Sequence, residues 1–192
     1  MEKKIKDIQQ EYKEKDDLEL PDFIEEYIRD GRPGVAKIIG QAKKRLDRLE
    51  QERQRLEVLR TYEHRYEDAY PMICGIDEVG RGQLAGPVCA AAVILPRDCE
   101  ILYINDSKKL SEARREALYA EIMEKAVAVG LGFASPEKID EVNILQATYI
   151  AMRQAIATLA VAPDLLLNDA VTIPEVSFKQ GPTTKGDDKS IS

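Results

Sequence analysis

Residues 74–87 read Cys74-Gly75-Ile76-Asp77-Glu78-Val79-Gly80-Arg81-Gly82-Gln83-Leu84-Ala85-Gly86-Pro87. An apolar run ends in two adjacent carboxylates, a Gly-Arg-Gly tripeptide follows, and a Gly-Pro pair opens a second apolar run. A carboxylate at the end of a buried strand is unfavourable unless it is paired, hydrogen-bonded or bound to a cation. The stretch therefore predicts two strands joined by a glycine-rich turn, with a candidate ion-binding site where the first strand ends.

The rest of this half of the chain alternates between strand and helix patterns. Short apolar runs predict strands, and Ser111 and Ser135 are plausible N-caps of two helices, the second with Pro136 at its first position. The predicted strands cover residues 72–77, 88–95, 130–134 and 165–169, and a further helix covers 143–160. This order predicts an α/β domain with a mixed sheet.

Asp169 ends an apolar strand in the same way as Asp77 and Glu78. If the two strands are neighbours, three carboxylates meet at one edge of the sheet, and oxygen ligands of this kind suit Mg²⁺ or Mn²⁺. Consecutive strand residues face opposite sides, so Asp77 and Glu78 share one ion only if the strand bends or ends there. The alternative is that each acid is simply a solvated strand terminus.

The first 70 residues differ in composition from the remainder. They are much more densely charged, and their apolar residues follow helical spacing, with helices expected around Ile5–Tyr12, after Leu20, and from Val35 to Tyr66. We therefore divide the chain into a charged helical extension, residues 1–70, and a globular domain, residues 71–192. The extension is either a helical hairpin packed on itself or on the domain, or an arm that binds nucleic acid or a partner through its basic residues.

Composition limits the class of protein. The 192-residue chain has a net charge of −7, so binding to a polyanion needs a local basic patch or bridging cations. Cys74, Cys89 and Cys99 form no C-x-x-C pair and, with a single histidine, predict reduced thiols rather than a zinc site. No signal peptide or membrane span is recognisable, which favours a cytoplasmic location.

Other motifs are weaker. Residues 80–85 match the G-x-G-x-x-A dinucleotide fingerprint, but Gly86-Pro87 and a second strand follow where a helix is required. The glycines are better explained as positions where the backbone lies close to a ligand. The guanidinium of Arg81 would then bind a phosphate group through two hydrogen bonds. Lys108 stands beside a helix start and could contact phosphate, whereas His64 is expected to be a surface residue.

Taken together, these motifs resemble ribonuclease HII, a family of bacterial endonucleases. The similarity rests on Gly75 to Gly82 with Leu84 to Val88, on Asn105-Asp106-Ser107-Lys108-Lys109-Leu110-Ser111, on Asn143 to Thr148, and on Lys185-Gly186-Asp187. It covers roughly residues 71–192, and the helical leader resembles the extension of some Gram-positive members.

The resemblance implies a ribonuclease H-like fold and divalent-metal-assisted hydrolysis with Mn²⁺ or Mg²⁺. It implies that Asp77, Glu78 and Asp169 are catalytic metal ligands. Gly80, Arg81 and Gly82 would read the 2′-hydroxyl of the ribonucleotide at the cleaved junction. The implied substrates are RNA–DNA hybrids and duplex DNA with embedded ribonucleotides, bound by a monomer that has no contact with membranes.

The sequence departs from the family pattern at its end. The family's fourth catalytic aspartate and its C-terminal substrate-binding tyrosine have no counterpart before Ser192. A truncated chain is therefore expected, and a catalytically impaired homologue that only binds hybrid nucleic acid is the alternative function. A third hypothesis is a helical interaction protein in which residues 1–70 matter most.

Overall fold

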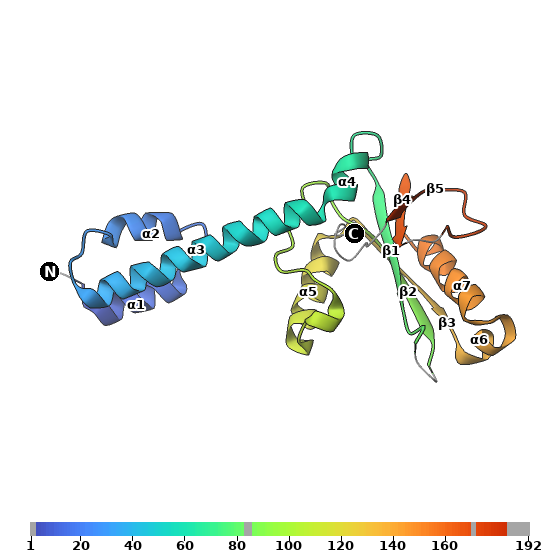
Figure 1. Ribbon diagram of the computed structural model, residues 1–192, viewed down its shortest axis with the longest axis horizontal. Helices are drawn as coiled ribbons and strands as arrows, with labels where there is room; N and C mark the ends of the chain where they lie inside the picture. The colour runs from blue at the N-terminus through green and yellow to red at the C-terminus, as the bar shows by residue number, and fades with distance from the viewer. Residues whose placement is uncertain (1–2, 83–85, 170–171, 184–192) are drawn as a thin grey trace. The chain divides into compact units, whose positions relative to one another are not determined.

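The computed structural model describes residues 3–82, 86–169 and 172–183. The chain folds into two compact units, residues 1–55 and residues 56–192, and helix α3 (Pro33–Leu59) runs across the division. Figure 1 labels the helices and strands of both units.

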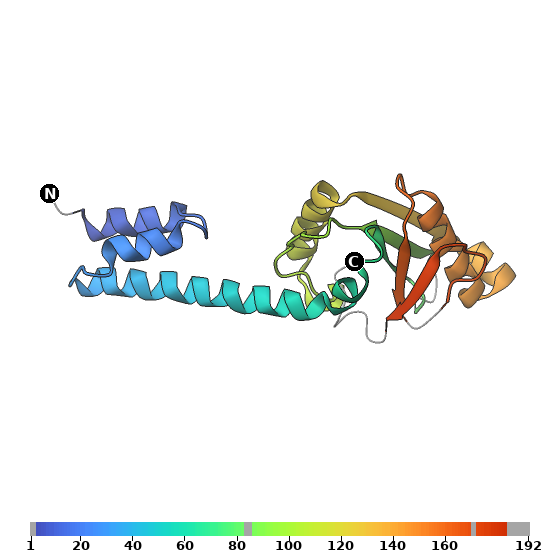
Figure 2. The ribbon, with the colours of Figure 1, turned by 90° about the horizontal axis from the view of Figure 1, so that it is seen from above.

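The first unit is a small helical assembly with its own core. Helices α1 (Ile5–Glu14) and α2 (Leu20–Tyr27) pack against the first part of α3 (Figure 2). The buried residues are those with the helical spacing seen in the sequence, and they comprise Ile8, Leu20, Phe23, Tyr27, Val35, Ile38, Ile39 and Ala42. The apolar residues with helical spacing thus form a core shared by these three helices.

The long helix expected from Val35 to Tyr66 is interrupted. Helix α3 ends at Leu59, and a separate helix α4 (Thr61–Tyr66) begins after Arg60. Arg60 has φ −83° and ψ 15°, so the chain leaves helical geometry there and changes direction. No Gly or Pro marks this position, so the break could not be predicted from a local helix breaker.

A mixed five-stranded sheet organises the second unit, as the sequence predicts. Its strand order is β3-β2-β1-β4-β5; β1 pairs antiparallel with β2, and β2 antiparallel with β3, whereas β4 runs parallel to both β1 and β5. The strands are β1 (Ile73–Val79), β2 (Val88–Ile94), β3 (Ala128–Ala134), β4 (Leu165–Asp169) and β5 (Lys179–Thr183).

Strand β5 was not predicted. It contains Gly181 and Pro182, which both disfavour a strand interior. Its place at the edge of the sheet explains the proline, because the outer side of an edge strand needs no N–H donor for a neighbour.

Helices α6 (Pro136–Val142) and α7 (Ile144–Ala157) follow β3, and α7 covers one face of the sheet (Figure 1). The core between α7 and the sheet includes Ile76, Val88, Ala151 and Met152. The predicted caps are confirmed: the Ser111 hydroxyl accepts from the Arg114 N–H at 3.4 Å, and Ser135 from Lys138 at 3.3 Å, at the starts of α5 (Glu112–Lys125) and α6.

Helix α4 and the segment after it pack on the other face. Tyr62, Tyr66 and Tyr70 contact a buried cluster of Ile73, Leu165 and Leu167. Residues 56–70, which the sequence places in the helical extension, therefore lie within the same compact unit as the sheet.

All three cysteines are free thiols, with Cys74 and Cys99 buried. Burial raises the pKa of Cys74 to about 12, so this thiol stays protonated and acts as a small apolar residue. Within residues 3–82, 86–169 and 172–183, no helix combines the length and apolarity that a bilayer crossing requires.

Candidate metal centre

The strand register brings two of the predicted carboxylate positions together. Strands β1 and β4 are parallel neighbours, and Ile76 pairs with Asn168. Asp77 and Asp169 each follow this pair by one residue, so their backbones lie side by side at the carboxyl ends of the strands. Because successive side chains of a strand point to opposite faces, the Asp77 side chain lies on the same face as those of Ile73, Leu165 and Leu167. The two strands are therefore neighbours, which is the condition for the predicted site, and the meeting of the three carboxylates stays a prediction.

Glu78 has a different environment from Asp77. The sequence predicted that this strand ends at Asp77, but β1 continues to Val79. Asp77 pairs with Ala91 of β2, and Glu78 pairs with Ala90. Because both residues lie inside a regular strand, their side chains leave opposite faces. Asp77 is exposed, whereas the Glu78 side chain is only 18% exposed. A shared ion would therefore require Glu78 to reach around the end of the sheet.

Arg81 is anchored beside Glu78. Its Nη1 donates to Glu78 Oε1 at 2.9 Å, and the arginine side chain is 44% exposed. The sequence predicted Arg81 as a fork for phosphate, and the structure adds an acidic partner from the end of β1. The guanidinium is thus held at this end of the sheet by a charge-assisted hydrogen bond.

The two glycines that flank Arg81 have different structural requirements. Gly80 has φ +100°, and a Cβ at this position would lie 2.4 Å from the Pro87 carbonyl oxygen. At Gly82 a Cβ would have no atom within 4 Å among the described neighbours. Gly80 is therefore needed to bring the two ends of the turn together, whereas Gly82 leaves space beside its backbone. Gln83, Leu84 and Ala85 lie outside the described residues.

Replacing Gly80 with alanine should destabilise the hairpin between β1 and β2. A non-glycine residue in this conformation costs about 1–3 kcal/mol, and the contact with Pro87 adds to that cost. Thermal unfolding followed by circular dichroism measures the loss. Gly82→Ala is the matched control and should unfold at the wild-type temperature; equal losses for both variants would contradict this assignment.

Lys108 lies in a short exposed turn of 3₁₀-helix, η1 (Ser107–Lys109). The Asp106 carboxylate accepts a hydrogen bond from the Lys108 N–H at 3.0 Å, which fixes the start of this turn. The backbone at Lys108 is thereby ordered while its ammonium group faces solvent. Its predicted role in phosphate binding stays a prediction.

Asn168 was not among the site residues predicted from the sequence. It is 1% exposed, occupies β4 between Leu167 and Asp169, and pairs in register with Ile76. An amide buried at this point is unusual in an otherwise apolar strand, and that contrast with Leu165–Leu167 was the available signal. Alternation assigns Asn168 to the same face of the sheet as Glu78, so the face covered by α7 also carries polar groups near the end of the strands.

The donor chemistry of Asp77, Glu78 and Asp169 fits a hard divalent cation. The predicted set contains only carboxylate oxygens, which Mg²⁺ and Mn²⁺ prefer, and no imidazole or thiolate. Among the side chains that the structure describes, no three His, Cys, Asp or Glu groups gather closely enough to hold a metal ion. The side chain of Asp169 is outside that set, so its role as a ligand stays a prediction.

The sheet order β3-β2-β1-β4-β5, with acidic residues at the carboxyl ends of the parallel pair β1 and β4, defines an α/β protein of the ribonuclease H-like class. The crystal structure of ribonuclease H2 from Pyrococcus horikoshii OT3 has this fold, with a TM-score of 0.51 and 21% sequence identity over 60% of this chain and 63% of that chain. The family model for ribonuclease HII matches residues 74–189, and the model for the ribonuclease HII N-terminal domain matches residues 4–67. The chain belongs to the ribonuclease HII family.

Curated relatives agree with this assignment. The chain is 62% identical over 168 residues to "Ribonuclease HII" of Lachnoclostridium phytofermentans, covering 88% of this chain and 66% of the relative. It is 48% identical over 179 residues to "Ribonuclease HII" of Clostridioides difficile strain 630, covering 91% and 70%. The resemblance inferred from the motifs is confirmed, and the chain spans about two thirds of the length of these relatives.

Proposed function

We propose that this protein is an endonuclease that hydrolyses the RNA strand of RNA–DNA hybrids and cuts on the 5′ side of ribonucleotides embedded in duplex DNA. The proposal is supported by the parallel register of β1 and β4, because Asp77 and Asp169 each follow the paired residues Ile76 and Asn168 by one position. Membership of the ribonuclease HII family supports the reaction class. We also propose that the protein is a monomer in the cytoplasm. The boundary between the charged extension and the catalytic domain is proposed to lie near residue 70.

In this proposal Asp77, Glu78 and Asp169 hold Mn²⁺ or Mg²⁺. A bound divalent ion supplies activation of the attacking water and stabilisation of charge on the leaving oxygen. Asp77 is exposed near the carboxyl end of β1, where its carboxylate would act as a ligand. Glu78, bonded to Arg81, would contribute from the opposite face at the end of the strand.

Recognition of the substrate is proposed for the turn after β1 and for Lys108. No described neighbour lies within 4 Å of a Cβ built on Gly82, so in this proposal a sugar approaches the backbone there, and the 2′-hydroxyl is the group that distinguishes RNA from DNA. Arg81 and the exposed Lys108 provide cations for phosphate groups, which a chain of net charge −7 must supply locally.

The proposal is tested with three end-labelled duplexes: one that carries a single ribonucleotide, the same sequence in DNA alone, and an RNA–DNA hybrid. We expect the first to be nicked 5′ of the ribonucleotide in Mn²⁺ or Mg²⁺, the hybrid to be cut, and the DNA duplex to stay intact. Binding of the hybrid without cleavage under any of these conditions would favour the non-catalytic alternative.

A further inference from the structure

Helix α4 packs on the face of the sheet to which Asp77 belongs, whereas Glu78 belongs to the opposite face. Its aromatic residues Tyr62 and Tyr66, with Tyr70 beyond its end, pack on Ile73, Leu165 and Leu167. Ile73 precedes Asp77 by four residues, and Leu167 precedes Asp169 by two, so all of these positions share one face. The tyrosines therefore cover the part of this face that lies directly before the carboxylate positions.

Tyr66 extends this contact to β5. Gly181 pairs in register with Leu167, and a Cβ built on Gly181 would lie 3.7 Å from Tyr66 Cε2. The ring thus lies close to the backbone of β5 as well as to the side chains of β4. Since β4 is bordered by β1 and β5, the Tyr66 ring is in a position to fix the spacing of the strand that carries Asp169.

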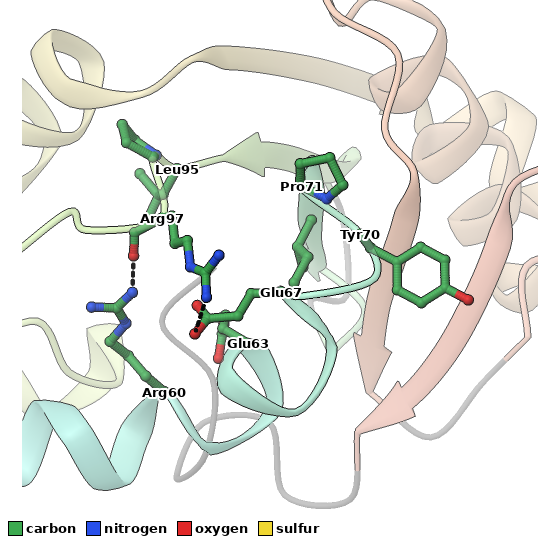
Figure 3. A pocket seen from close by; sticks show the side chains of 9 residues that line it. Arg60, Glu63, Glu67, Tyr70, Pro71, Leu95 and Arg97 are labelled. Carbon is green, nitrogen blue, oxygen red and sulfur yellow. Dashed lines mark hydrogen bonds and ion pairs between the residues drawn. The ribbon is translucent and has the colours of Figure 1, made fainter.

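Polar contacts hold the α4 segment at both sides of the sheet. Towards β5, the Lys179 ammonium donates to the Tyr70 hydroxyl and lies 4.8 Å from the ring centroid. Towards β2, Arg97 Nη2 lies 3.3 Å from Glu67 Oε1 (Figure 3). The same nitrogen lies 2.9 Å from Asp68 Oδ1. The segment therefore spans from the residues after β2 to the first residue of β5, with β1 and β4 between.

The α4 segment and the sheet do not pack completely against each other on the β2 side. A cavity of about 110 Å³ lies on this side. Its lining includes Tyr70, Pro71, Leu95 and Arg97, whose side chains are drawn in Figure 3. On the β4 and β5 side the tyrosines instead contact apolar side chains directly. The close fit is thus on the side of the strand that ends in Asp169.

We infer that Tyr66 is a positioning residue for the carboxylates, acting through the packing of its ring on β4 and β5. The inference rests on the proposed function, since it assigns to Tyr66 the spacing of the predicted metal ligands. It also gives a role to residues that the family's N-terminal domain, matched up to residue 67, contributes to the unit that contains the sheet.

The test is the affinity for Mn²⁺ alone, measured by titration calorimetry without nucleic acid. Residues that orient metal ligands from outside the coordination sphere change metal affinity by about 10–100-fold, so we expect Tyr66→Ala to raise the Mn²⁺ dissociation constant by about tenfold or more. Tyr66→Phe keeps the ring and should bind Mn²⁺ as the wild type does. Leu118→Ala is the matched control, because Leu118 is buried in a separate cluster with Cys99 and Ile101.

The outcomes distinguish the positioning role of Tyr66 from the existence of the metal centre. If Tyr66→Ala weakens Mn²⁺ binding and Leu118→Ala of equal or lower thermal stability does not, the positioning role is supported. If both variants bind Mn²⁺ with the same affinity while Asp77→Asn abolishes binding, the positioning role is overturned and the metal centre stands. If Asp77→Asn binds Mn²⁺ as tightly as the wild type, the metal centre itself is overturned.

Discussion

Replacing Asp77 with asparagine should reduce cleavage of a duplex with one ribonucleotide by at least about a thousandfold, because a metal ion contributes several kcal/mol to transition-state stabilisation. Asparagine has nearly the shape of aspartate but lacks the negative charge that a divalent ion requires. Asp77 is exposed, and its backbone pairing with Ala91 does not depend on the side chain. The substitution should therefore remove activity while the sheet stays folded.

Single-turnover cleavage in Mn²⁺ and in Mg²⁺ measures this loss, and thermal unfolding verifies the fold. Asp140→Asn is the matched control, because Asp140 is an exposed acid on α6 and its replacement changes the net charge by the same amount. We expect the control to cleave at the wild-type rate. Cleavage by Asp77→Asn within about tenfold of wild type would show that Asp77 is not a required ligand.

Much of the second unit could be predicted because its local signals agree with its tertiary contacts. The apolar run at Val88 predicts a buried strand, and Ser111 and Ser135 cap the helices as expected. The sequence predicts that Asp77 and Asp169 lie close together only if their two strands are neighbours. Strand order is a tertiary property, so only the register of β1 with β4 brings these two positions side by side.

The parts that could not be predicted depend on contacts between distant segments. Strand β5 has a poor strand sequence and forms because β4 offers it a parallel partner at the edge of the sheet. The break at Arg60 has no local breaker, and the tyrosines after it gain burial only by turning onto Ile73 and Leu165. Likewise, pairing with β2 extends β1 past Asp77, which is why Asp77 and Glu78 leave opposite faces.

The largest loss of stability is expected for Gly132→Ala. Strand β3 meets α7 through Gly132, where a Cβ would lie 1.9 Å from the Ala151 carbonyl oxygen and 2.6 Å from the Ala155 backbone nitrogen. Both obstacles are backbone atoms of a helix, so no side chain can rotate away, and the helix itself must move. Overpacking typically costs 1–3 kcal/mol and occasionally more, so we expect a loss of about 3 kcal/mol or more in the free energy of unfolding.

Urea unfolding followed by circular dichroism gives this free energy, and Gly40→Ala provides the control. Gly40 lies inside α3, where a Cβ would have no atom within 4 Å, so alanine should stabilise its helix by about 0.5–1 kcal/mol through higher helix propensity. Opposite signs for one chemical change would show that close approach of α7 to β3, rather than glycine content, determines the effect. A loss below about 1 kcal/mol for Gly132→Ala would mean that α7 can withdraw from β3 at little cost, and would contradict the prediction.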